Sequence, residues 1–181
     1  MKIGFDAKRL YSNMSGLGNY SRTLLRNLSS YLPANDYVLY TTKITLNKET
    51  NSFLEDSGYT TTLSRSYLKS LWRSFGVVSQ LKKDNIELFH GLSHEIPFGI
   101  QKSGIKTVVT IHDLIFKIYP EFYHFADRLF YNIKIKNSLN HADRIIAISE
   151  STKKDIIRFY NISPDKIDVI YQPCDPIYYD D

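Results

Sequence analysis

Short apolar runs recur along the chain, and several of them stop abruptly at polar residues. Three such runs cover residues 86–91, 107–113 and 144–150, and their polar ends are His90, His112 with Asp113, and Ser149 with Glu150. Continuous apolar runs of this length are typical of parallel strands that are buried on both faces. The same reasoning predicts further strands at residues 2–5, 37–41, 59–63 and 167–171.

Apolar residues at helical spacing lie between these strands. They predict helices over residues 20–32, 68–83, 121–140 and 151–160, while residues 6–19 and 44–58 are expected to be polar loops. The core face of the third helix is expected to consist of Phe122, Phe125, Ala126, Leu129, Phe130 and Ile133. Strands that alternate with helices form parallel sheets with right-handed crossovers. The predicted fold is therefore α/β: a single Rossmann-like domain whose doubly wound, mostly parallel sheet is flanked by helices.

The strand ends indicate where a site would lie. In open α/β sheets, ligands bind in the crevice outside the carboxyl ends of the strands. There an imidazole can hydrogen-bond a substrate hydroxyl and a neighbouring carboxylate can orient it. We therefore predict that His112 and Asp113 contact a ligand, with His90 in the equivalent place on the next strand. The alternative for each histidine is a structural role at the strand end.

Chain length and cysteine content limit the number of domains and the cellular compartment. A chain of 181 residues is long enough for one domain with a full core, and it contains no stretch of about 20 apolar residues that could span a bilayer. The single cysteine, Cys174, excludes an internal disulfide and fits a reducing compartment, so we expect the cytoplasm. Residues 1–171 are expected to form the domain, and residues 172–181 the start of a linker.

Positive charge is concentrated in one stretch. Residues 57–83 contain no acidic residue but five basic ones, although the net charge of the whole chain is only +4. The predicted helix there carries Arg65, Lys69 and Arg73 at intervals of four beside aromatic residues, a pattern that suits an anionic membrane surface. The alternative is a helix packed on the sheet with solvated cations. A nucleic-acid partner is not expected, because no recognition motif accompanies the isoelectric point of about 9.0.

A glycine-containing segment lies between the first strand and the first predicted helix. Gly16, Leu17, Gly18 and Asn19 could bring backbone N–H groups close to a phosphate at the helix N-terminus. The segment lacks the dinucleotide-binding fingerprint, since position 21 is Ser21 and the loop begins too far after the strand. A plain turn is the alternative.

A metal site is not expected. His90 and His94 are four residues apart, but Gly91 and Pro97 argue against a helix that would bring them onto one face. The sequence after His94 also departs from the zinc motif H-E-x-x-H.

Several of these segments, taken in order, resemble a known family. The segments are Ile3-Gly4-Phe5-Asp6, the loop at residues 15–20, and the runs at residues 109–114, 142–151 and 166–170. Together they resemble the N-terminal, acceptor-binding domain of retaining glycosyltransferases of family four, which have two Rossmann-like domains (the GT-B architecture). The resemblance covers nearly the whole chain.

The resemblance implies an enzyme that moves a hexose from a nucleotide-sugar donor to a glycan or lipid-linked acceptor, with mannose as a plausible sugar and no metal cofactor. It implies that Gly16 and Gly18 face the donor phosphates, that His112 lies beside the transferred sugar, and that Ser149 and Glu150 line the same cleft. A lipid-linked acceptor would place the protein at the inner face of the cell membrane. The family's second, donor-binding domain would follow Asp175, so the chain is expected to be a fragment with little activity alone.

A different class of function stays open from the sequence. A single Rossmann-like domain could bind a phosphorylated or sugar ligand by itself, without catalysis. Tight nucleotide-sugar binding by this chain alone would favour that second hypothesis.

Overall fold

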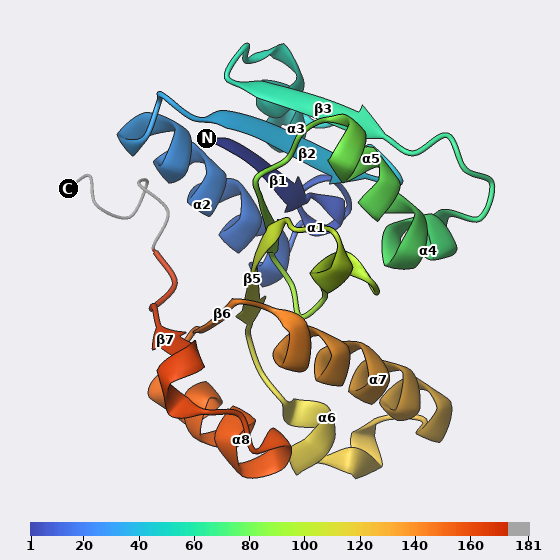
Figure 1. Cartoon of the computed structure of the whole chain (residues 1–181), viewed down its shortest axis with the longest axis vertical. Helices are drawn as coiled ribbons and strands as arrows, with labels where there is room; N and C mark the ends of the chain where they lie inside the picture. The colour runs from blue at the N-terminus through green and yellow to red at the C-terminus, as the bar shows by residue number, and fades with distance from the viewer. Residues whose placement is uncertain (174–181) are drawn as a thin grey trace.

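The computed structural model describes residues 1–173. Seven parallel strands form one sheet in the order β3-β2-β1-β4-β5-β6-β7 (Figure 1). The strands are β1 (Lys2–Asp6), β2 (Asp36–Thr41), β3 (Tyr59–Leu63), β4 (Leu88–Gly91), β5 (Lys106–Ile111), β6 (Arg144–Ala147) and β7 (Ile167–Val169). The strand order reverses between β1 and β4, so the predicted doubly wound, Rossmann-like fold is confirmed.

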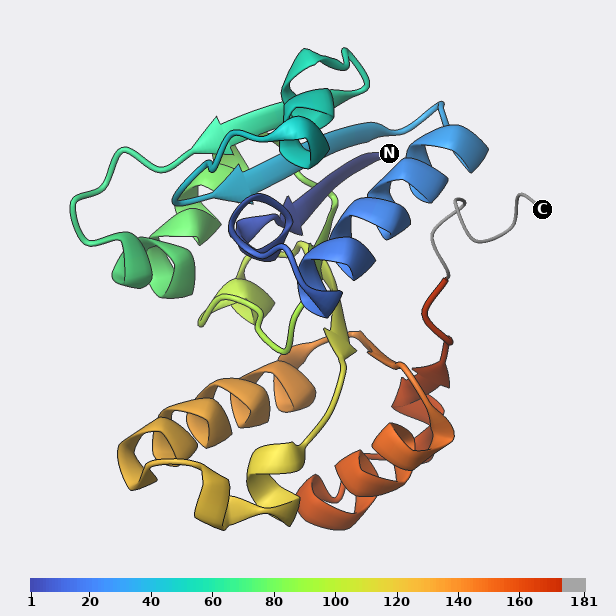
Figure 2. The ribbon, with the colours of Figure 1, turned by 180° about the vertical axis from the view of Figure 1, so that it is seen from behind.

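Helices cover both faces of the sheet. The α-helices are α1 (Lys8–Ser12), α2 (Gly16–Tyr31), α3 (Lys48–Glu55), α4 (Lys69–Leu71), α5 (Val77–Lys83), α6 (Ile115–Ile118), α7 (Phe125–His141) and α8 (Glu150–Tyr160). The other helical turns are η1 (Trp72–Gly76), which is a π-helix, and the 3₁₀ turns η2 (Ile100–Lys102), η3 (Pro120–Phe122) and η4 (Pro164–Lys166). Figure 2 shows the same arrangement from behind.

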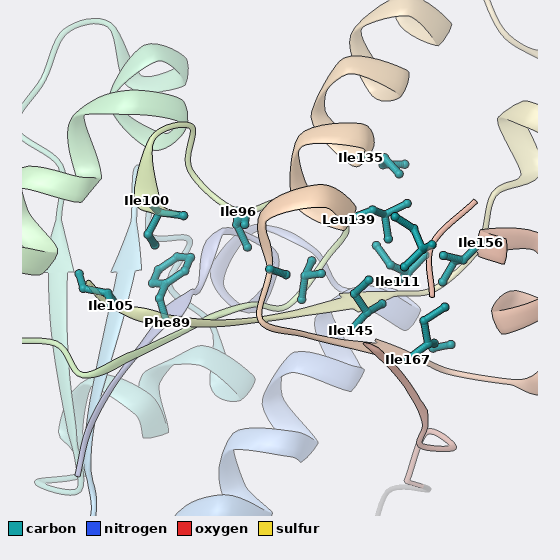
Figure 3. Close-up of a cluster of buried hydrophobic side chains, with 14 of the residues drawn as sticks. Phe89, Ile96, Ile100, Ile105, Ile111, Ile135, Leu139, Ile145, Ile156 and Ile167 are labelled. Carbon is teal, nitrogen blue, oxygen red and sulfur yellow. The ribbon is translucent and has the colours of Figure 1, made fainter. Parts of the chain in front are cut away.

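Two buried clusters lie on opposite faces of the sheet. Along β2, Tyr37 and Leu39 belong to the cluster under α1, α2 and α3, whereas Val38 and Tyr40 belong to the cluster under α5, α7 and α8. This alternation follows from the two-residue period of a strand. Figure 3 shows the second cluster, in which Ile111, Leu139, Ile145, Ile156 and Ile167 pack together.

Two helices lie where the sequence analysis expected loops. The first is α1, inside residues 6–19, and the second is α3, inside residues 44–58. Helix α3 begins with a capping box, in which the Asn47 side chain accepts from the backbone of Thr50 while the Thr50 hydroxyl accepts from the backbone of Asn47. Only Thr50 and Phe53 of this helix are buried, so apolar periodicity gave too weak a signal.

The predicted core face of the long helix is wrong. All six side chains expected to be buried are exposed, including Phe122 (76%) and Phe125 (77%). The N-terminal half of α7 extends past the strands, and the helix packs on the sheet through Ile135, Ser138 and Leu139 instead (Figure 1). The helix predicted at residues 68–83 is also interrupted, because η1 separates α4 from α5.

Arg73 is not a surface cation, which corrects its predicted place beside Arg65 and Lys69. Arg73 belongs to η1, and its side chain is 13% exposed. The guanidinium forms ion pairs with Asp6 at the end of β1 and with Glu95 in the loop after β4. Lys134 of α7 donates to the same Glu95 carboxylate at 3.1 Å. Burial lowers the pKa of Arg73, but the two carboxylates outweigh this effect and raise it above its ordinary value.

The predicted glycine loop is the first turn of α2, because the helix begins at Gly16. A Cβ atom on Gly18 would lie 1.7 Å from the backbone oxygen of Asn13, whereas one on Gly16 would meet nothing within 4 Å. The buried Arg22 donates to that Asn13 oxygen at 3.0 Å and to the oxygen of Leu10 at 2.8 Å. Gly18 therefore permits a close approach between α2 and the backbone of Asn13, in the segment that joins α1 to α2. The hydrogen bonds of Arg22 hold this segment in place.

Replacing Arg73 with Met should destabilise the protein strongly. Arg73→Met leaves Asp6 buried without its cation and weakens the pairing of Glu95, and breaking a buried pair costs about 3–5 kcal/mol. The matched control Arg65→Met, at an exposed position, should change the free energy of unfolding by less than about 0.5 kcal/mol. Urea denaturation of both variants measures the difference, and equal effects would contradict this role for Arg73.

Alanine at the two glycines of α2 should have opposite effects. Gly18→Ala forces its methyl group onto the Asn13 backbone, and overpacking of this kind costs about 1–3 kcal/mol or more. Gly16→Ala has open space, so it should leave the free energy of unfolding unchanged or raise it by up to about 1 kcal/mol. Thermal unfolding followed by circular dichroism compares the two, and a tolerated Gly18→Ala would refute the close approach.

Candidate functional site

The ends of β4, β5 and β6 lie at one edge of the sheet, as predicted. Gly91 pairs with Val109, and Ile111 pairs with Ala147, so the residues that follow these strands emerge beside one another. This edge includes the reversal of strand order between β1 and β4. Open α/β sheets bind ligands at such a position.

A pocket of about 210 Å³ opens at this edge. Its polar lining comes from α1, from the loops after β4 and β5 and from α7, and its apolar lining comes largely from α6 and α7. The lining residues are Arg9, Leu17, Ser93, His94, Glu95, Asp113, Phe116, Tyr123, Tyr131, Lys134 and Ile135. Two cations, two carboxylates and three aromatic rings therefore surround one small hollow, a combination that suits a polar ligand with apolar faces.

His112 lies directly after β5, beside the pocket, and its exposed fraction is 6%. Its Nε2 atom is 2.9 Å from the carbonyl oxygen of Leu92, and its Nδ1 atom is 2.8 Å from Nε2 of Gln172. The Tyr20 ring lies edge-on to the imidazole, and the two ring centroids are 4.8 Å apart. Burial lowers the pKa of His112; the Leu92 hydrogen bond and Asp113 oppose this shift, and Arg9 adds to it. These contacts favour a neutral imidazole that accepts a hydrogen bond at Nδ1.

Asp113 lines the pocket, as its predicted role requires. Its Oδ1 atom accepts from the backbone N–H of Ile115 at 3.1 Å, which fixes the carboxylate where α6 begins. The side chain remains exposed. A second oxygen is therefore available to a ligand hydroxyl.

His90 does not face the pocket, which corrects the prediction that it contacts a ligand. Its Nε2 atom is 2.9 Å from the hydroxyl of Thr110, its ring packs against Phe5, and its exposed fraction is 6%. Burial and, secondarily, the charge of His112 lower the pKa of His90 to about 4. It is a neutral core histidine because β4 continues to Gly91 and the His90 side chain points into the layer beneath α2.

Ser149 and Glu150 begin α8. The Ser149 hydroxyl accepts from the backbone N–H of Thr152 at 3.1 Å, a helix N-cap. Thr152 in turn donates from its hydroxyl to the backbone oxygen of His112 at 3.1 Å. Ser149 thus supports the backbone at His112 through the cap, although neither it nor Glu150 lines the pocket. Among the four predicted glycine-segment residues, Leu17 lines the pocket, while Gly16, Gly18 and Asn19 lie in the adjoining turn of α2.

The sequence analysis missed His94 and Arg9. His94 has a left-handed backbone (φ 65°), its ring centroid is 5.4 Å from that of His112, and its backbone N–H donates to Thr110 at 2.9 Å. Burial and then the charge of His112 lower the pKa of His94 to about 4. The spacing of His94 from His90 suggested only a metal site. The sequence pattern gave no reason to place Arg9 in a site, because helix α1, which carries it, was not predicted.

Within residues 1–173, no three side chains of histidine, cysteine, aspartate or glutamate gather as metal ligands. In the same range, no helix is both long and apolar enough to cross a bilayer.

Two curated relatives are similar over part of the chain. An O-antigen chain mannosyltransferase of Salmonella typhimurium, RfbU, is 27% identical over 105 residues, which is 58% of this chain and 27% of the relative. O-antigen chain mannosyltransferase B of Escherichia coli is 30% identical over 92 residues, which is 50% of this chain and 23% of the relative. The matched regions thus span about a quarter of each relative.

Solved structures share the fold over almost the whole chain. A glycosyltransferase from Rickettsia africae superposes with a TM-score of 0.58 at 14% identity, covering 99% of this chain and 45% of that one. The lipopolysaccharide outer core galactosyltransferase WaaB superposes with a TM-score of 0.56 at 17% identity, covering 96% of this chain and 46% of that one. These likenesses agree with the Rossmann-like sheet described above.

The decisive match is to a whole family. Residues 15–177, nearly the full length of the chain, match Glycosyltransferase Family 4. The matched region includes α2, all the strands after β1 and every pocket-lining residue except Arg9. The chain belongs to glycosyltransferase family 4.

Proposed function

We propose that this chain is the acceptor-binding part of a retaining glycosyltransferase that moves a hexose from a nucleotide-sugar donor to a glycan or lipid-linked acceptor. The observation that carries the proposal is the pocket at the strand ends, with His112 beside it as a neutral hydrogen-bond acceptor and Asp113 in its wall. The mannosyltransferase relatives favour mannose as the transferred sugar.

In this proposal, His112 accepts a hydrogen bond from a hydroxyl of the transferred sugar, and Asp113 accepts from a second hydroxyl. The phenyl and phenol rings of the pocket wall cover the apolar face of a sugar. The backbone N–H groups of Gly16 and Leu17, at the N-terminus of α2, face the donor diphosphate and offset the charge that develops there, whereas the N–H of Gly18 donates to Asn13 and Ser15. Ser15, its N-cap residue, makes no side-chain hydrogen bond to this turn. No metal cofactor is part of the proposed reaction.

The role of His112 is tested by sugar transfer in the full-length protein that contains this chain. His112→Ala removes a hydrogen bond to the sugar, and the loss of one preorganised group of this kind lowers kcat by about 10²–10³-fold. The control His124→Ala, at an exposed position, should leave transfer unchanged. Full activity of His112→Ala would refute the role.

The chain alone should turn over little donor, because a reaction in a cleft between two domains needs both walls. The chain covers less than half of the two solved structures described above, which supports this expectation. Calorimetry with nucleotide sugars on the 181-residue chain separates the two functions. Weak binding agrees with a partial site, whereas tight binding would favour a non-catalytic binding module.

We also propose peripheral contact with the anionic, cytoplasmic face of the cell membrane. The surface formed by residues 65–75 supports this contact, because Arg65 and Lys69 are exposed beside apolar side chains. The exposed apolar residues there are Tyr67 (102%), Leu68 (64%), Leu71 (53%) and Phe75 (55%). Apolar side chains that enter the interface, with cations at the lipid phosphates, are typical of peripheral membrane binding.

Vesicle flotation tests the membrane contact. Exchanging both cations of the surface for glutamate, Arg65→Glu with Lys69→Glu, should weaken binding to anionic vesicles at least about tenfold, since each cation contributes about 1 kcal/mol. The matched control reverses two exposed cations at the end of α5, Lys82→Glu with Lys83→Glu. Equal weakening by both pairs would show that total charge, and not the surface at residues 65–75, determines binding.

A further inference from the structure

Both ring nitrogens of His112 are occupied by groups of the chain itself. On one side of the ring, Nε2 lies 2.9 Å from the backbone oxygen of Leu92, which belongs to the loop after β4. On the other side, Nδ1 lies 2.8 Å from the side-chain nitrogen of Gln172, sixty residues further along the chain. The second contact has no part in the function proposed above.

The chemistry of the two partners fixes which nitrogen carries the proton. A carbonyl oxygen only accepts, so Nε2 of His112 must donate to Leu92, and in the neutral ring Nδ1 then carries a lone pair. The amide nitrogen of Gln172 donates to that lone pair. Since an unprotonated imidazole nitrogen has a single lone pair, a sugar hydroxyl and Gln172 cannot both donate to it at the same time.

Two aromatic rings pack against the imidazole. The centroid of the edge-on Tyr20 ring lies 4.8 Å from that of His112, and the centroid of the His94 ring lies 5.4 Å from it. Only 6% of His112 is exposed, and Gln172 lies against Nδ1, the nitrogen that carries the lone pair. A ligand hydroxyl must therefore displace Gln172.

Gln172 lies in the exposed segment that follows β7. The backbone N–H of Ile170 donates to Ala147 at 3.0 Å, which continues the pairing of β7 with β6, while the side chains of Ile170 and Tyr171 are 53% and 68% exposed. The hydrogen bond of Gln172 thus ties this segment to the end of β5. A hydrogen bond of this kind contributes about 0.5–1.5 kcal/mol, so a ligand can break it readily.

We propose that Gln172 is a reversible occupant of the ligand-facing nitrogen of His112. In the free protein it covers Nδ1, and it leaves when a sugar hydroxyl donates to the same lone pair. Sugar binding thereby releases the segment after β7 from the end of β5. The identity of the ligand as a sugar rests on the proposed function, whereas the contact itself does not.

The contact is tested by nitrogen NMR on the 181-residue chain with ¹⁵N-labelled histidine. Gln172→Leu removes the donor and should shift the Nδ1 resonance of His112 towards that of a free acceptor, while Nε2, still bonded to Leu92, changes little. Tyr171→Leu is the matched control, because it changes an exposed neighbour, and it should leave both resonances in place. An unchanged Nδ1 resonance in Gln172→Leu would overturn the proposal.

The displacement is tested by sugar transfer in the full-length protein. Gln172→Leu removes the competitor, so KM for the nucleotide sugar should fall by about two- to tenfold, which corresponds to about 0.5–1.5 kcal/mol, with kcat unchanged. Tyr171→Leu should leave KM unchanged. A KM that does not fall in Gln172→Leu would refute the displacement. A full-length protein that transfers no sugar would instead refute the proposed function, and the NMR result would still decide the contact.

Discussion

The buried guanidinium of Arg73 joins the helical turn η1 to the ends of two paired strands, β1 and β4. It pairs with Asp6 at the end of β1 and with Glu95 after β4, and Lys134 of α7 reaches the same Glu95. Charges in a protein interior persist only when each has its partners, so removing Arg73 leaves the Asp6 carboxylate buried and uncompensated. These charges therefore constrain four segments together, and two of the charged residues, Glu95 and Lys134, also line the pocket.

The loop after β4 links this constraint to the site. Glu95 belongs to the charge network and also lines the pocket, while Leu92 of the same loop accepts the hydrogen bond that orients His112. The loop folds back closely, because a Cβ atom on Gly91 would lie 2.1 Å from the backbone oxygen of Glu95. The position of the imidazole thus depends on a tight turn and a buried ion pair as well as on its own strand.

Much of the fold could be predicted because buried parallel strands have a strong signature, and that signature also located His112 and Asp113. Features set by tertiary contacts could not. Helix α3 has a polar pattern and a capping box, Arg73 has the same periodicity as a solvated cation, and the aromatic residues of α7 extend past the sheet that periodicity assigned them to. His90 and His112 both end apolar runs in the sequence. In the structure, His90 lies within β4, whereas His112 is the first residue after β5, and the sequence pattern does not reveal this difference.

The strand order has a consequence for how the chain is assembled during synthesis. β1 is the first strand to be made, yet it lies inside the sheet, with β2 on one side and β4 on the other. Ile3 pairs with Leu88, so one edge of β1 stays open until residue 88 has left the ribosome. An unpaired apolar strand is prone to aggregation over such an interval. The segment from β1 to β4 therefore has reason to engage a chaperone while it is being made.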